Sequence, residues 1–179
     1  MFEHNYDLPD SLSQRLAIAI RHIEFARVYS SSLLQDLTED QWYWTPDSYT
    51  THIAWQAGHL AMSQYGLTLY RQRGRNLDVD KKLMSSKFRK LFMRGTKPVA
   101  DRAAYPAPSE IIETLDRVHA QMRIEVATFS EEDLDQPLDA PHAAFATRYG
   151  ALLFAGDHEM IHSGQIGMLR RLMGLEPLR

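Results

Sequence analysis

Apolar residues recur every three or four positions in four segments of the chain, which is the spacing of amphipathic helices. The four segments cover residues 11–36, 51–73, 109–129 and 147–172. Gly74 and Gly174 follow the second and the fourth, and glycine commonly ends a helix. No segment shows the alternation of β-branched residues that is typical of a strand. We therefore expect an all-α protein built as a four-helix bundle.

The stretch from Gly74 to Pro108 makes the connection between the second and third helices long for a loop. It could form a short additional helix, or it could be the long crossover that some bundles need. Its apolar residues are Leu83, Met84, Phe88, Leu91 and Phe92. The 179 residues are enough for one domain with its own core, which we expect to span residues 1–179.

Two similar turn sequences follow the first and third helices. Thr38 stands three residues before Gln41, and Ser130 stands three residues before Asp133. A hydroxyl residue followed at this distance by an acid or an amide has the form of a capping box. The similarity has two explanations, a pair of related helical hairpins or chance.

Composition narrows the function classes. The chain has no cysteine, which excludes disulfides, thiolate metal sites and a cysteine nucleophile. Its formal charge of -3 argues against a nucleic-acid partner, which usually requires a basic excess. The N-terminal residues lack the pattern of a signal peptide, and no apolar run could span a bilayer. We therefore expect a cytoplasmic protein without a membrane partner.

Two of the eight histidines, His158 and His162, are four residues apart and lie one turn apart on one helix face. Such a pair can bind one metal ion. The same residues match H-E-x-x-H, in which zinc proteases use the glutamate as a general base. The protease interpretation is disfavoured because the extended motif needs glycine and histidine where Gln165 and Met168 stand. A protease also needs an edge strand, and none is expected.

A di-iron interpretation also lacks a ligand. Glu159 and His162 match the Glu-x-x-His element of di-iron bundles, which occurs twice in those proteins. The nearest second element runs from Asp116 to His119, with aspartate in place of glutamate. Glu24 and a carboxylate on the second helix would have to complete the ligand set. The second helix contains no acid before Asp78, so the ligand set stays incomplete.

A third histidine for the 158/162 pair must come from another helix. His52 and His59 are seven residues apart on roughly the same face of the second helix, and either could point inward. His59 lies deeper in the helix among small residues, whereas His52 is near its start and is expected to be exposed. Glu159 is the candidate general base, the alternative being a surface acid or one that orients a ligand histidine.

Four stretches carry a resemblance to a known family: residues 37–42, 57–61, 130–138 and 158–174. They resemble the DinB/YfiT-like metalloenzymes, and the most specific of them is His158-Glu-Met-Ile-His162 with the residues that follow. The resemblance implies a four-helix bundle, frequent dimers and a three-histidine metal site that maps onto His59, His158 and His162. Some related proteins are hydrolases, or transferases and isomerases that use a small thiol such as bacillithiol or mycothiol, while many members have no assigned reaction.

These observations predict a divalent-metal protein, with zinc or nickel as the first ions to test. Three imidazoles with an open fourth position favour a metal-dependent hydrolase or a small-thiol-dependent transferase acting on a small-molecule substrate. A thiol would have to be a soluble cosubstrate, because the chain has none. We also expect a homodimer. The alternative is a non-catalytic bundle that the metal stabilises or that serves dimerisation.

Overall fold

Four long helices dominate the computed structural model, which describes residues 8, 12–46 and 51–178. The helices are α1 (Gln14–Leu34), α3 (Ile53–Tyr65), α7 (Pro108–Val126) and α9 (Arg148–Leu172). A π-helical turn, Gly66–Tyr70, and α4 (Arg71–Arg73) continue α3. These elements confirm the predicted all-α class. No helix in the described ranges is long and apolar enough to cross a membrane.

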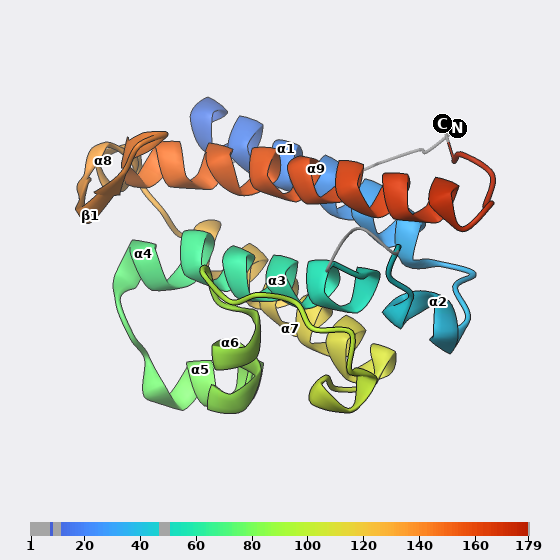
Figure 1. Ribbon diagram of the computed structural model, residues 1–179. Coiled ribbons are helices and arrows are strands. Elements are labelled where there is room, and N and C mark those ends of the chain that lie inside the picture. Colours follow the sequence, from blue (N-terminus) through green and yellow to red (C-terminus); the bar gives the residue numbers. More distant parts are fainter. Residues whose placement is uncertain (1–7, 9–11, 47–50, 179) are drawn as a thin grey trace.

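Helices α1 and α9 form one pair and α3 and α7 the other (Figure 1). Arg15 lies over the ring of Tyr149 near the beginnings of α1 and α9, and Arg170 donates to the carbonyl of Leu33 near their ends. These two helices are therefore parallel. The contacts from Gln64 to His119 and from Arg73 to Glu125 show that α3 and α7 also run parallel.

The long connection between α4 and α7 follows from this topology. Because α3 and α7 are parallel, the chain must return along the length of the bundle before α7 begins. The return contains α5 (Leu77–Leu83), α6 (Ser86–Phe92) and a 3₁₀ turn, Arg102–Ala104. The connection is thus both the crossover and the additional helical structure that the sequence left open. Phe92 of α6 is fully buried against the core.

The two capping boxes are present, and each begins a short helix. Thr38 and Gln41 cap α2 (Glu39–Tyr43), and Ser130 and Asp133 cap α8 (Glu131–Asp135). In each box the hydroxyl accepts from the third residue and that residue's side chain accepts from the capping main-chain N–H. The similar turn sequences therefore reflect similar local structure.

The expectation of no strands is wrong at one place. Strands β1 (Pro137–His142) and β2 (Phe145–Thr147) form an antiparallel hairpin between α8 and α9. Residues 137–146 contain no β-branched residue, so periodicity gave no signal. Tertiary contacts hold the hairpin instead: Phe145 packs in the core, and the Arg71 guanidinium donates to the carbonyl of Ala140 and lies over the Phe145 ring.

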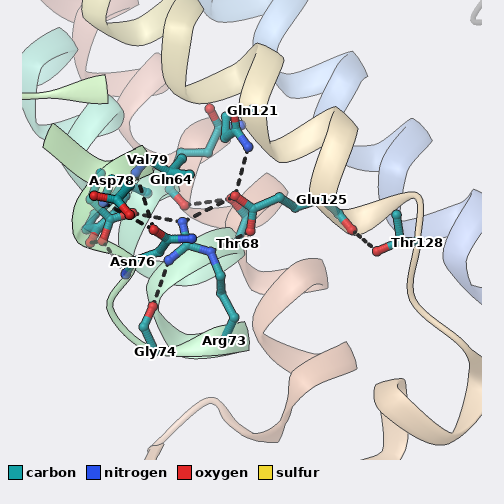
Figure 2. Close-up of polar contacts among 12 residues, drawn as sticks. Gln64, Thr68, Arg73, Gly74, Asn76, Asp78, Val79, Gln121, Glu125 and Thr128 are labelled. Carbon is teal, nitrogen blue, oxygen red and sulfur yellow. Dashed lines mark hydrogen bonds and ion pairs between the residues drawn. The ribbon is translucent and has the colours of Figure 1, made fainter. Parts of the chain in front are cut away.

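A cluster of polar side chains links the end of α4 to α5 and α7 (Figure 2). The Arg73 guanidinium donates to Glu125 of α7, to Asp80 of α5 and to the carbonyl of Gly74. Asp80 is buried and also accepts from the hydroxyl of Tyr65. The Arg73 guanidinium therefore links α4, α5 and α7 at the point where the helical segment that begins with α3 ends.

Gly58 should be intolerant of any side chain, because Phe92 approaches it closely. A Cβ at position 58 would lie 2.4 Å from the Phe92 ring, which is fully buried. We expect Gly58→Ala to lower the free energy of unfolding by about 1–3 kcal/mol in urea titrations. Gly164→Ala is the matched control, since nothing lies within 4 Å of that position. It should stabilise by about 0.5–1 kcal/mol. Equal effects of the two changes would contradict the packing argument.

Candidate metal centre

The structure brings His59 of α3 together with His158 and His162 of α9. The ligand atoms that these three side chains offer lie within 4.8 Å of one another. The ring centroids are 4.8 Å apart for His59 and His162, 5.3 Å for His59 and His158, and 4.5 Å for His158 and His162. His59 and His162 are buried and His158 is half-buried, so the group opens on the His158 side.

Hydrogen bonds orient two of the three rings. Nδ1 of His59 donates to the main-chain oxygen of Phe92 at 2.7 Å, and Nδ1 of His162 donates to Oε1 of Gln56 at 2.5 Å. Since these partners only accept, each Nδ1 must carry its proton and each Nε2 keeps its lone pair as an acceptor. Gln56 is itself held, because its amide donates to Thr51 and Gln165. Such outer contacts are typical of metal-binding histidines.

Aromatic rings flank the three histidines on two sides. Trp55 stacks parallel to His59 with a centroid distance of 4.9 Å. On the other side Phe154 contacts His158 at 5.8 Å and Phe145 at 5.2 Å. His142 of β1 contacts Phe154 at 5.4 Å. The hairpin that periodicity missed therefore forms part of the wall near the site.

The expectation that His52 is exposed is wrong, because this residue is buried. Its Nδ1 accepts from the main-chain N–H of Trp55 and so caps α3, while Nε2 donates to the carbonyl of Val99. Both ring nitrogens are thus used by the main chain. His52 is directed to the segment after α6, and His59 is the histidine of α3 that joins the α9 pair.

Glu159 lies between the two histidines of α9 in sequence, but its carboxylate is held by α1. Nε of Arg27 donates to it at 2.7 Å and Nη2 at 3.2 Å. The hydroxyl of Ser30 donates to the same carboxylate. Arg27 also donates to Oε1 of Gln64 and to the carbonyl of Leu115, and both Arg27 and Glu159 are buried. The sequence contained no signal for this ion pair.

Glu24, the acid considered for a di-iron site, has other partners. It forms ion pairs with His119 and Arg123 of α7 at 3.2 Å each. Despite its burial, the pKa of Glu24 is lowered by the hydrogen bond and charge of His119 and by the nearby arginines. Among the described residues the three histidines are the one group of His and acid side chains with metal-binding spacing.

A family model described as the DinB superfamily matches residues 22–166. The chain belongs to the DinB superfamily. A solved structure of a conserved protein from Enterococcus faecalis matches with a TM-score of 0.69 at 17% identity, covering 91% of this chain and 99% of that one. This likeness supports the fold. No curated protein matches the chain.

The histidines of this DinB-superfamily site are neutral at physiological pH. Burial is the main cause that lowers the pKa of His158 to about 4 and that of His162 to about 3, and the neighbouring histidines lower both further. Burial also lowers the pKa of His59, which the bond to Phe92 partly offsets. Neutral imidazoles can bind a metal without first releasing protons.

Lowering the pH should destabilise the metal-free protein at pH values well above those at which its carboxylates titrate. The folded-state pKa values of His158 and His162 lie below the unfolded value, so the unfolded chain binds more protons as the pH falls below about 6.5. The free energy of unfolding should therefore decrease from pH 7 to pH 5. Urea titrations with chelator will measure the slope. We expect a smaller slope for His162→Gln, and an unchanged slope would contradict the assignment.

Proposed function

We propose that this protein binds one divalent metal ion on His59, His158 and His162 and uses it in catalysis. The observation that carries the proposal is the convergence of three neutral imidazoles, two with Nδ1 committed to fixed acceptors. Three ligands around zinc, with bonds of about 2.0–2.1 Å, would need their nitrogens roughly 3.3 Å apart. The present limit of 4.8 Å means that the rings would have to move closer by about 1.5 Å when an ion binds.

A metal-dependent hydrolase or a small-thiol-dependent transferase is the reaction class that this donor set favours. A divalent ion on neutral ligands keeps its full charge and lowers the pKa of a coordinated water towards about 7, or that of a thiol further. Three protein ligands leave a position for substrate. No fourth His or acid joins the group among the described residues. We expect a small-molecule substrate, because His59 and His162 are buried and the rings of Trp55 and Phe154 lie against the histidines.

A non-catalytic, dimerising bundle is the second candidate, and one observation favours it. The outer face of α9 exposes apolar side chains at helical spacing, with exposed fractions of 55% for Ile161, 47% for Met168 and 54% for Leu172. The neighbouring α1 exposes Ile18 and Phe25. Large exposed apolar patches often mark protein interfaces. A homodimer through this face is compatible with either candidate.

Glu159 is better suited to positioning than to proton transfer. A general base needs a free oxygen within hydrogen-bond reach of the group that loses the proton. Both oxygens of Glu159 accept from Arg27, and one also accepts from Ser30. The carboxylate thus fixes the α9 segment that carries His158 and His162 against α1. The role of general base stays a prediction, which the second experiment below separates from positioning.

Removal of any of the three histidines should abolish tight metal binding. We expect His59→Ala, His158→Ala and His162→Ala each to reduce zinc or nickel from about one ion per chain to background. The measurement is elemental analysis of untagged, folded protein after dialysis against the metal. His52→Asn is the control, because asparagine can keep the helix cap and His52 is not in the group. Stoichiometric metal in the His59→Ala protein would contradict the ligand set.

Arg27 and Glu159 should behave as a coupled pair if Glu159 is a positioning residue. Arg27→Met and Glu159→Gln each leave a buried group without its partner, and we expect losses of about 3–5 kcal/mol in unfolding free energy. The double variant Arg27→Met/Glu159→Gln should lose clearly less than the sum of the two. Full stability of Glu159→Gln, together with loss of turnover only, would instead identify Glu159 as the base.

A further inference from the structure

Ser63 contacts the nitrogen of His59 that a metal would use. Its Oγ lies 3.2 Å from Nε2 of His59. Ser63 is one helical turn after His59 in α3. Because Nδ1 of His59 donates to the carbonyl of Phe92, Nε2 is the acceptor and the Ser63 hydroxyl is the donor. Within residues 8, 12–46 and 51–178, no other side chain bonds an Nε2 of the three histidines.

Metal binding must break this hydrogen bond, since a ligand nitrogen cannot give its lone pair to both the ion and the hydroxyl. The Ser63 hydroxyl would then lie beside the ligand nitrogen with an unused proton. Ser63 is half-buried, as is His158. A π-helical turn begins three residues later at Gly66, and such irregular turns are frequent at functional sites.

We propose that the Ser63 hydroxyl donates a hydrogen bond to the ligand in the fourth position of the ion, and so selects anionic ligands with a free lone pair. The inference rests on the proposed three-histidine metal site and adds a positioning residue to it. The class of ligand follows from the donor: a carboxylate, a thiolate or a small inorganic anion can accept the bond. An uncharged apolar group cannot.

Cobalt-loaded protein tests the inference without a known substrate. Co²⁺ gives visible absorption that reports its ligands, and azide serves as the anionic probe. We expect Ser63→Ala to keep one Co²⁺ per chain with undiminished affinity, and to bind azide at least about tenfold more weakly, since it loses a hydrogen bond to a charged group. Ser63→Thr should restore azide affinity because it keeps the hydroxyl.

Ser163→Ala is the matched control, because Ser163 follows His162 directly but donates to the main-chain oxygen of Glu159. It should leave azide binding unchanged. Equal azide affinity in wild type and Ser63→Ala would overturn the inference while leaving the metal site intact. Weaker Co²⁺ binding by Ser63→Ala would also overturn it, since the hydroxyl would then be a ligand. If wild type binds no Co²⁺, the proposed function itself fails.

Discussion

The buried guanidinium of Arg27 is the interaction on which the arrangement of the bundle depends. From α1 it donates to Glu159 of α9, to Gln64 of α3 and to the main-chain oxygen of Leu115 in α7. One side chain therefore contacts all three other long helices. A buried charge is tolerated only when its partners are complete, so sliding any of these helices would leave the guanidinium unsatisfied. Apolar packing alone would permit such sliding more easily.

The residues that bind Arg27 are close in sequence to the histidines of the site. Glu159 is adjacent to His158 in α9, and Gln64 lies five residues after His59 in α3. Arg27 thus fixes α3 and α9 relative to each other close to the place where their histidines meet. Gln56 adds a second link across the same two helices, through His162 and Gln165. The three-histidine group is therefore positioned by polar contacts that link α1, α3 and α9.

Local sequence patterns were sufficient to predict the long helices and two of the three histidines of the site. Helical periodicity located α1, α3, α7 and α9, and a spacing of four placed His158 and His162 on one face. A spacing of seven could not choose between His52 and His59. That choice depends on Val99, forty-seven residues from His52, which accepts from its ring. The pair of Arg27 and Glu159 and the packing that holds the hairpin are likewise long-range, so local spacing carries no signal for them.

The charge balance of the interior bears on what the site accepts. Among the described residues the buried acids are Glu24, Asp80 and Glu159, and each is paired with an arginine. None of these buried acids is left to neutralise a divalent ion on the three neutral imidazoles. The two positive charges of such an ion would have to be balanced by what enters from solvent, which favours an anionic ligand or one that loses a proton on binding. Hydroxide, a thiolate and a carboxylate all meet this condition.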